Sequence, residues 1–249
     1  MGNVYVAVIS LSFLSVLTTA AGVALAIRFR ESSIGIAVGI GFSAGIMLLI
    51  SFFELIPEST AEAGALTALT AVGFGGLVLF ALNLVIPHTH LIEERNGIGA
   101  RTLKSVYLVV FGLILHDVPE GFAMANSYIA SPSLGVLVAV AIALHNLPEE
   151  FAMAVPAVLL RRKRFLYGSA LLSALAEPAG ALIGLVAVDF APALNPLFMA
   201  FAAGAMIFVS LHELVPMARR YGNLPLFAVG VVLSALVYLG LSILISSSP

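Results

Sequence analysis

The sequence carries one polar motif twice inside apolar surroundings, as LHDVPEGFAMA at residues 115–125 and as LHNLPEEFAMA at residues 144–154. In a helix that turns about 100° per residue, the histidine, the polar residue after it and the first glutamate share one face. These residues are His116, Asp117 and Glu120 in the first copy, and His145, Asn146 and Glu149 in the second. Imidazole and carboxylate groups together are ligands of Zn²⁺, Fe²⁺ and Mn²⁺. The two motifs therefore indicate a divalent cation site.

The composition places these motifs in a membrane. The chain has 249 residues, of which 61% are hydrophobic and 10% are charged, and its mean hydropathy is +1.13. A soluble domain carries roughly 25% charged residues, so this chain could not cover itself in water. Its lack of cysteine excludes a thiolate metal site. We therefore expect an all-α polytopic protein of the plasma (inner) membrane, in contact with the lipid bilayer and not with nucleic acid.

Eight apolar runs are long enough to cross a hydrocarbon core, which takes about twenty residues. They lie at 4–27, 34–56, 65–86, 104–128, 133–160, 165–187, 193–218 and 224–246. All eleven Lys and Arg residues then fall on the same side of the membrane. The positive-inside rule makes that side cytoplasmic, so both termini are expected outside.

Related segments recur in spans that this topology runs in opposite directions. FSAGIMLLISFFELIP begins at Phe42 in the second span, and FAAGAMIFVSLHELVP begins at Phe201 in the seventh. TAAG, which ends at Gly22, similarly matches EPAG, which ends at Gly180. We expect one transporter domain, 1–249, built as a 3+2+3 inverted repeat with parts at 1–86, 104–160 and 165–249. Such repeats are typical of secondary transporters, whose substrate sites lie near the midplane.

The acids inside the spans require partners. A charge at the bilayer centre costs about 2.5–3.5 kcal/mol, so five ionised carboxylates would cost on the order of 15 kcal/mol. The five are Asp117, Glu120, Glu149, Glu150 and Glu177, and no Lys or Arg lies inside a span, since Lys104 is only the first residue of the fourth. Protons or divalent cations could neutralise them, and the two imidazoles favour metal, with two ions bridged by Glu120 and Glu149. The alternative is a set of hydrogen-bonded polar residues that lock the helices together.

The motifs resemble the His-Asn-x-Pro-Glu-Gly motifs in spans four and five of the ZIP (Zrt/Irt-like) divalent metal transporters, and AEPAG at 176–180 resembles that family's sixth-span motif. The eight spans, the outside termini and the 3+2+3 arrangement also match, with the GufA-like branch most similar. The resemblance implies a binuclear site between spans four and five. Its first ion would use His116, Glu120, His145 and Glu149, with Met47 nearby. Its second ion would use Asp117, Asn146 and Glu177, and would share Glu120 and Glu149 as bridges.

Two residues depart from the family pattern. Asp117 replaces the usual Asn, which adds negative charge and should tighten cation binding. Glu150 replaces the usual Gly, and it either lines the inner half of the path or faces a polar neighbour. Further polar residues fall where entry or exit ligands would be useful, and a role at a helix end is an equal alternative. They are Ser51 and Glu54 outside, and Ser210, His212 and Glu213 inside.

The remaining expectations concern activity and partners. We expect uptake of a divalent metal into the cytoplasm, with Zn²⁺ as the first candidate and Fe²⁺, Mn²⁺ and Cd²⁺ as others, with no organic cofactor and no enzymatic activity. His88 and His90 in a cytoplasmic loop either capture metal or are simply solvated. Gly180 and Gly184 form a Gly-x-x-x-Gly pattern that fits internal packing or a homodimer face. The alternative functions are an intramembrane di-metal enzyme and a proton-coupled transporter of a non-metal solute.

Overall fold

Every regular element of the described chain is a helix. The computed structural model describes residues 2–29, 33–85, 116–159, 161, 163–220 and 223–246, and these contain no β-strand. The first helices are α1 (Gly2–Ser12), α2 (Leu14–Phe29), α3 (Ser33–Ile50), α4 (Ile56–Ala63) and α5 (Ala65–Val85). After a helix at 116–130 come α7 (Pro132–Leu159), α8 (Lys163–Phe190), α9 (Asn195–Val209), α10 (Val215–Arg220) and α11 (Leu224–Ser246). The all-α fold class predicted from the sequence is confirmed.

Seven helical stretches among the described residues are long and apolar enough to cross a membrane. They are Gly2–Phe29, Ile34–Ala63, Ala65–Leu84, Pro132–Val155, Lys163–Phe190, Pro192–Met217 and Leu224–Ile245. Each coincides with one of the predicted apolar runs. The predicted run at 104–128 is described only from residue 116 onward, where the helix at 116–130 covers its second half. The protein is therefore a multi-pass membrane protein, and the count of eight spans stays a prediction.

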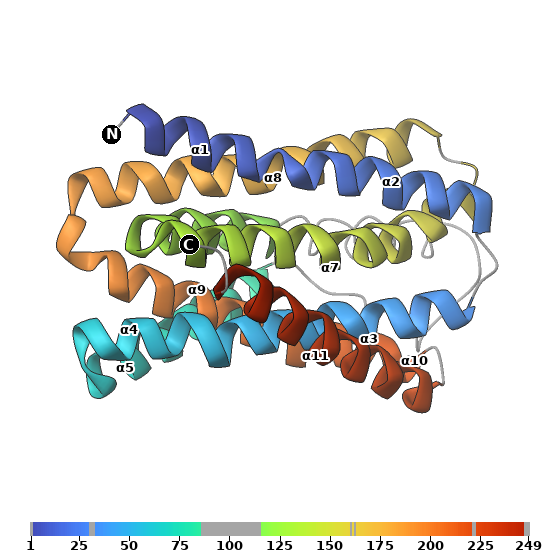
Figure 1. Cartoon of the computed structure of the whole chain (residues 1–249). Coiled ribbons are helices and arrows are strands. Elements are labelled where there is room, and N and C mark those ends of the chain that lie inside the picture. The colour runs from blue at the N-terminus through green and yellow to red at the C-terminus, as the bar shows by residue number, and fades with distance from the viewer. Residues whose placement is uncertain are drawn as a thin grey trace.

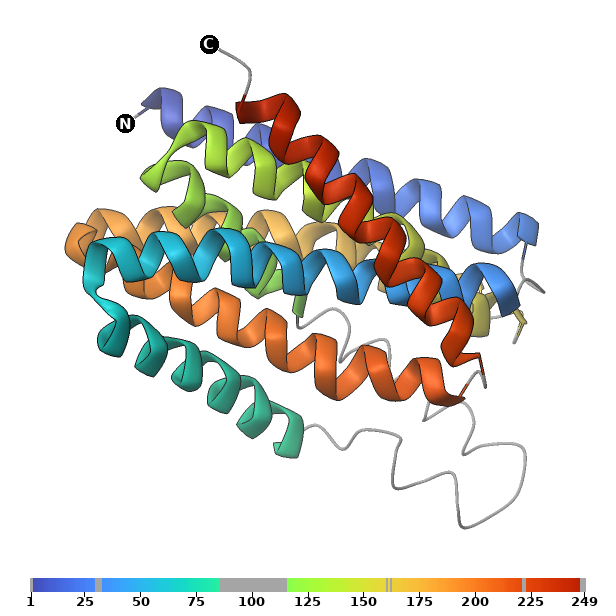
Figure 2. The same ribbon diagram turned by 60° about the horizontal axis from the view of Figure 1, so that its bottom comes forward.

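The helices form one elongated bundle with α7 in its interior (Figures 1 and 2). α7 packs against α2, α3, α8 and α11. Of its apolar window, 72% is buried inside the protein, against 17% for α5 and for α11. The helix that carries the second polar motif is thus the central helix, and α5 and α11 lie at the periphery.

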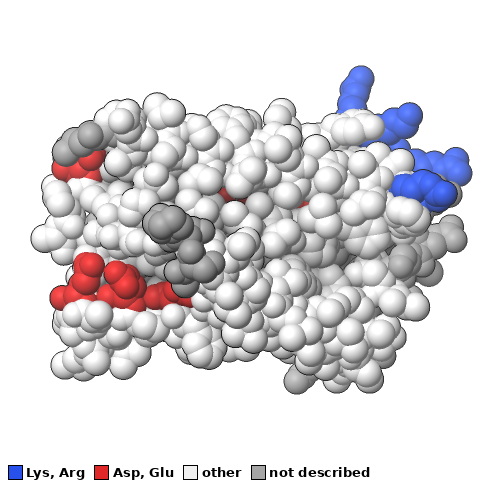
Figure 3. Space-filling model, in the orientation of Figure 1, with Lys and Arg blue, Asp and Glu red and all other residues white. Residues whose placement is uncertain are grey.

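Charge is concentrated at the two ends of the bundle, and little is visible on the surface between them (Figure 3), where the exposed side chains include many large hydrophobic ones. Where α2 ends and α8 begins, the exposed side chains include Arg28, Lys163 and Arg164, and we call this the basic end. The opposite, acidic end carries the exposed side chains of Glu62 on α4 and Asp189 on α8. An apolar belt between two charged ends is the distribution that a membrane-spanning helix bundle requires.

Two π-helical segments interrupt the bundle at positions that the sequence repeat relates. They are Ser51–Leu55, between α3 and α4, and Ser210–Leu214, between α9 and α10. Each ends with an amide that donates to the carbonyl five residues earlier, Ile56 to Ser51 and Val215 to Ser210. A proline follows one residue later in both cases and cannot donate to the carbonyl four residues before it, which disrupts the regular α-helical ladder there. α3 and α9 run in opposite directions in Figure 1, so the two distortions lie in antiparallel helices.

Close contacts between helices depend on glycine. A Cβ at Gly180 would overlap the Val118 carbonyl, and one at Gly184 would lie 2.9 Å from the Cβ of Ala125. The Gly-x-x-x-Gly pattern of α8 therefore serves packing against the helix at 116–130 within the chain. α5 and α9 approach in the same way, because a Cβ at Gly75 would overlap the backbone carbonyl of Phe201.

Two glycines on α5 give a matched test of this packing. We expect Gly75→Ala to destabilise the protein by about 1–3 kcal/mol, because the added methyl group meets backbone that cannot rotate away. Gly73→Ala is the control, since Gly73 has open space around its Cβ position. It should be neutral or stabilising by about 0.5–1 kcal/mol, because alanine loses less backbone entropy than glycine. Thermal unfolding in detergent measures both variants, and equal effects would contradict the packing described here.

Candidate metal centre

Two histidine–glutamate pairs lie crosswise between the helix at 116–130 and α7. Nε2 of His116 contacts Oε1 of Glu149, and Nε2 of His145 lies 3.0 Å from Oε1 of Glu120. Ligand atoms of His116, Glu120 and Glu149 all lie within 4.8 Å of one another, which is compatible with a single bound metal ion. All four side chains are buried. The two helices thus contribute one imidazole and one carboxylate each, and we call these four residues the core.

Helix geometry explains why these side chains converge. Within each motif the histidine and the glutamate are four residues apart, so both project from the same face one turn apart. Nε2 of His145 is accordingly 4.0 Å from Oε2 of Glu149 on its own helix. The hydroxyl of Ser43 on α3 donates to the carbonyl of His145 over 2.8 Å, which ties α3 to α7 at the core.

The ring of His145 is oriented for a cation. Its Nδ1 lies 3.1 Å from the carbonyl of Ala141, which can only accept, so Nδ1 carries the hydrogen in the neutral ring. The lone pair of Nε2 then faces the carboxylate of Glu120 at 3.0 Å. Two acceptors at this distance repel each other unless a proton or a metal ion lies at the site. In metal sites, the imidazole nitrogen that does not bind the metal commonly donates to a carbonyl in this way, which fixes the orientation of the ring.

The core also has polar atoms without partners. Nδ1 of His116, Oε2 of Glu120 and Oε2 of Glu149 are buried and have no hydrogen-bond partner among the described residues. An unpaired buried polar atom is costly in an apolar interior. Two free carboxylate oxygens beside the first set of ligands are what bridging to a second cation requires.

The predicted second set of ligands is divided between two places. Nδ2 of Asn146 donates to Oε2 of Glu177 on α8 over 3.0 Å, so these two residues are together as expected. Asp117 instead accepts a hydrogen bond of 2.7 Å from Ser173, and its other oxygen is 3.7 Å from Nε2 of His116. Ser173 also contacts the carboxylate of Glu150. The structure therefore groups Asp117 with Glu150, and not with Asn146 and Glu177.

Met47 and the two π-segment serines lie where α3 meets α9. Met47 is fully buried, and its sulfur accepts a 3.6 Å hydrogen bond from Ser210. Ser51 donates to the carbonyl of Met47 over 2.7 Å, and Ser210 lies 2.8 Å from the carbonyl of Met206. The two serines therefore occupy equivalent positions in the two antiparallel helices.

The residues predicted to line the pathway outside and inside the membrane contact residues that do not belong to the core. The hydroxyl of Tyr238 on α11 donates to Glu54 near the acidic end. His212 stacks on Phe208, with 4.8 Å between the ring centroids, and its Nδ1 lies 3.3 Å from Nδ2 of Asn83 on α5. Glu213 is half-buried next to it. His88 and His90 lie outside the described residues.

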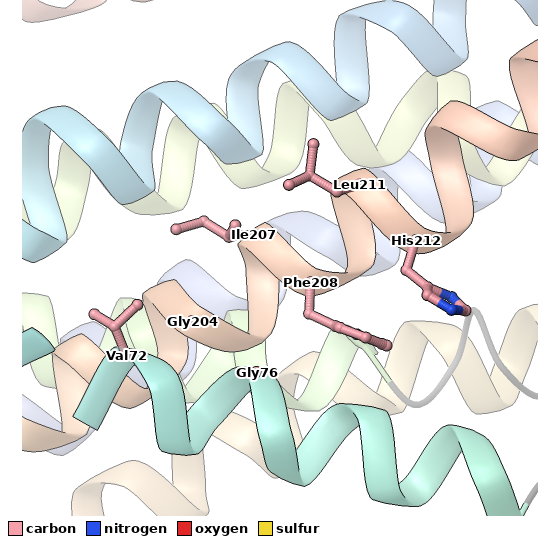
Figure 4. A pocket seen from close by; sticks show the side chains of 7 residues that line it. All are labelled: Val72, Gly76, Gly204, Ile207, Phe208, Leu211 and His212. Carbon is pink, nitrogen blue, oxygen red and sulfur yellow. The ribbon is translucent and has the colours of Figure 1, made fainter. Parts of the chain in front are cut away.

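His212 belongs to a shallow apolar groove and not to the core. Figure 4 shows the groove between α5 and α9, with Phe208 and His212 pointing toward α5. It is lined by Val72, Gly76, Gly204, Ile207, Phe208, Leu211 and His212. The exposed imidazole lies at the edge of a surface that the apolar belt presents to lipid.

Three polar residues of this region were not predicted from the sequence. They are Ser43, Ser173 and Thr19, whose hydroxyl lies 3.3 Å from Oε1 of Glu150. A signal for two of them existed in the repeat. The alignment of TAAG with EPAG pairs Thr19 with Glu177, and the same offset pairs Ser15 with Ser173.

The fold and the core define a class of protein: a polytopic membrane protein with buried nitrogen and oxygen ligands for a cation at the centre of its helix bundle. Comparison with known families narrows this class. Residues 86–245, more than half of the chain, match the family model described as ZIP Zinc transporter. The chain belongs to the ZIP zinc transporter family, as the two motifs predicted.

Individual relatives agree. The chain is 38% identical over 234 residues to the zinc transporter ZupT of Corynebacterium aurimucosum, covering 86% of this chain and 88% of the relative. It is 36% identical over 260 residues to the zinc transporter ZupT of Chlorobium limicola, covering 94% and 95%. The zinc transporter GufA of Myxococcus xanthus is 37% identical over 182 residues, 70% of each chain. These relatives are named as transporters and not as enzymes.

Metal binding should stabilise the protein through the core. We expect saturating Zn²⁺ or Cd²⁺ to raise the melting temperature of the purified protein, because a ligand at 100 times its Kd adds about 2.7 kcal/mol. Replacing Glu120 and Glu149 together by Ala should remove most of that shift. Glu62→Ala at the exposed acidic end is the control and should keep it. An equal shift in all three proteins would place the bound metal elsewhere.

Proposed function

We propose that this protein transports a divalent metal cation, with zinc as the first candidate, across the membrane into the cytoplasm through a binuclear site at mid-depth. The observation that carries the proposal is the core itself. Four buried ligands from two central helices lie inside an apolar belt, where ionised carboxylates need a cation nearby. Membership of the ZIP family and the relatives named as zinc transporters support the choice of substrate.

The first ion would be held by the core residues His116, Glu120, His145 and Glu149. The second would lie beside it, held by Asn146 and Glu177, with the unpartnered oxygens of Glu120 and Glu149 as bridges. Asp117, expected in this second set, lies on the other side of the core, with one oxygen 3.7 Å from Nε2 of His116, and would be a ligand of neither ion. Met47 would act only indirectly, because its sulfur is engaged by Ser210.

The 3+2+3 inverted repeat provides a route to alternating access. A Cβ added to Gly22 of α2 would lie 2.7 Å from the carbonyl oxygen of Leu147. A Cβ added to Gly180 of α8 would overlap the carbonyl of Val118 in the same way. The glycines are matched in the TAAG and EPAG repeats, and the two carbonyls are matched in the polar motifs. Equivalent contacts between repeat-related residues support a pseudo-two-fold arrangement. Rocking of the outer helices against the central pair would then open the core to each side in turn.

The direction follows from charge. By the positive-inside rule the basic end faces the cytoplasm, so α1 begins and α11 ends on the outer side (Figure 2). Metal would enter past Ser51 and Glu54 and leave past Ser210 and Glu213. The hydrogen bond from Tyr238 to Glu54 would close the outer route, and it would break when metal enters.

The alternatives are distinguishable. The relatives are named as transporters, which speaks against an intramembrane di-metal enzyme. A proton-coupled transporter of a non-metal solute would not bind stoichiometric metal, and its flux would not respond to Zn²⁺ or Cd²⁺. The capacity for Fe²⁺, Mn²⁺ and Cd²⁺ is tested by competition, since each fits the same nitrogen and oxygen ligands with different strength.

Uptake of radiolabelled zinc into proteoliposomes tests the proposal directly. We expect saturable uptake by the wild-type protein and loss of nearly all flux when Glu120 and Glu149 are both replaced by Ala. Glu62→Ala should transport normally, because that side chain is exposed at the acidic end. Unchanged flux in the double variant, with the protein folded, contradicts the mechanism.

Acid should oppose binding. Metal displaces protons from imidazoles and carboxylates, so the apparent affinity for zinc falls as protons compete for the same atoms. We expect the half-saturating concentration of zinc to rise steadily as the pH is lowered from about 7 to about 5, the range in which histidine ordinarily titrates. Uptake measured at several pH values, with no pH gradient across the vesicle, checks this. A pH-independent affinity would argue against histidine ligands.

A further inference from the structure

A second polar cluster adjoins the core and is not used by the two ions described above. It consists of Thr19 on α2, Asp117, Glu150 on α7 and Ser173 on α8, and we call it the oxygen cluster. Ser173 donates a hydrogen bond of 2.7 Å to Asp117 and also contacts Oε1 of Glu150. This Oε1 lies 3.3 Å from the hydroxyl of Thr19. The four residues are 3%, 7%, 4% and 4% exposed, so water does not solvate their charges.

The cluster has too few hydrogens for its acceptors. Ser173 has one hydroxyl hydrogen but contacts two carboxylates, and Thr19 supplies one more to Glu150. Oε2 of Glu150 is buried and has no hydrogen-bond partner in the described part of the chain. Two ionised carboxylates that share one donor in a buried space need a positive charge between them. Among the described residues, the ion-pair partner of Asp117 is His116, and His116 already contacts Glu149.

The cluster lies on the side of the core that faces the basic end. α7 runs from the acidic to the basic end, so Glu150 follows Glu149 in that direction (Figures 1 and 3). α8 runs the other way and passes Ser173 before Glu177, which puts Ser173 about 6 Å nearer the basic end at 1.5 Å per residue. Asp117 connects the cluster to the core through His116 at 3.7 Å. The Asn146–Glu177 pair and the oxygen cluster therefore flank the core at different depths.

The repeat shows how the two flanking clusters are related. Ser15 on α2 lies beside Glu177, as Ser173 on α8 lies beside Glu150, and the Ser15 hydroxyl donates to the carbonyl of Ser12 over 2.7 Å. Repeat matching exchanges Ser15 with Ser173, Asn146 with Asp117, and Glu177 with Thr19. Position 150 corresponds to Gly121, where a Cβ would overlap the carbonyl of Glu177. At the corresponding contact between α7 and α2, the glycine belongs to α2 and is Gly22. Its lack of a side chain leaves room for the side chain of Glu150 on α7.

Glu177 of α8 thus supplies a carboxylate on one side of the core, and Glu150 of α7 supplies a carboxylate on the other side. We propose that Thr19, Asp117, Glu150 and Ser173 form an oxygen-only subsite that receives the divalent cation from the core on its way to the basic end. The proposal rests on the proposed function and adds a third position to it. Because the subsite has no imidazole, it binds zinc more weakly than the core and suits release. Oxygen ligands alone also favour Mn²⁺ relative to the core.

Counting bound ions tests the subsite without any measurement of flux. Purified protein is brought to equilibrium by dialysis against saturating Mn²⁺, and metal per chain is measured by mass spectrometry. We expect Glu150→Gln to bind one ion fewer than the wild type and to keep the ions of the core. Glu62→Gln is the control and should match the wild type. Ser173→Ala keeps the charges and removes one ligand oxygen, so it decides the test if Glu150→Gln fails to fold by size-exclusion chromatography.

Transport provides the second readout. We expect Glu150→Gln to lower the maximal rate of uptake about tenfold, as loss of one charged contact worth about 1.4 kcal/mol would. The half-saturating concentration should stay near the wild-type value, because entry and core binding precede the subsite. Wild-type ion count and rate in both variants overturn the proposal. An unchanged ion count with an altered pH dependence of uptake also overturns it, because the positive charge would then be a proton.

The two proposals fail in different ways. If the wild type moves no metal, the proposed function is wrong, whatever the ion count. If the wild type transports zinc and the Glu120, Glu149 double variant does not, yet Glu150→Gln binds and transports normally, only the oxygen subsite is wrong.

Discussion

The cost of charge in an apolar interior governs the centre of this protein. The two imidazole–carboxylate pairs are buried on all sides, and the described cationic side chains of Lys and Arg lie at the basic end, far along the bundle from the core. Neutrality at the core must therefore come from protons or bound cations. A site that is costly when empty and stable when filled has an inherent affinity for divalent metal. The surrounding helices must therefore hold the four side chains of the core together even when no cation is bound.

Small residues make that possible. The helix at 116–130 and α7 each lean on a neighbour, α8 or α2, through a glycine that lets two backbones touch. In a bilayer such close packing replaces the hydrophobic effect as the force that joins helices. The contacts of Gly22 and Gly180 lie within one turn of the glutamates of the core, so they fix the register of the ligands as well as the distance between helices. Packing and ligand geometry are thus set by the same few residues.

The parts of the site that helix periodicity determines could be predicted from the sequence. His116 with Glu120 and His145 with Glu149 are one turn apart, so each pair shares a face whatever the neighbours do. Partners across helices could not be predicted, because they depend on how α2 and α8 are rotated and staggered. Asp117 was expected beside Glu177, but the stagger of α8 brings Ser173 to it instead. Serine and threonine are common in membrane helices, so before their neighbours were known only the repeat, which pairs Thr19 with Glu177 and Ser173 with Ser15, distinguished them. The first part of the fourth span and the loop histidines lie outside the described residues, so the count of eight spans and the role of those histidines remain predictions.

The separation of charge between the two ends has a kinetic consequence. Carboxylates at one end of a low-dielectric bundle attract divalent cations from solution and raise their concentration there. Arginines and lysines at the other end repel the same ions and lower the frequency with which they approach from that side. Both effects act over about 10 Å at 0.1 M salt and weaken as the ionic strength rises. The protein is thus a rectifier in its rates of ion capture, although its equilibrium remains set by the metal concentrations on the two sides.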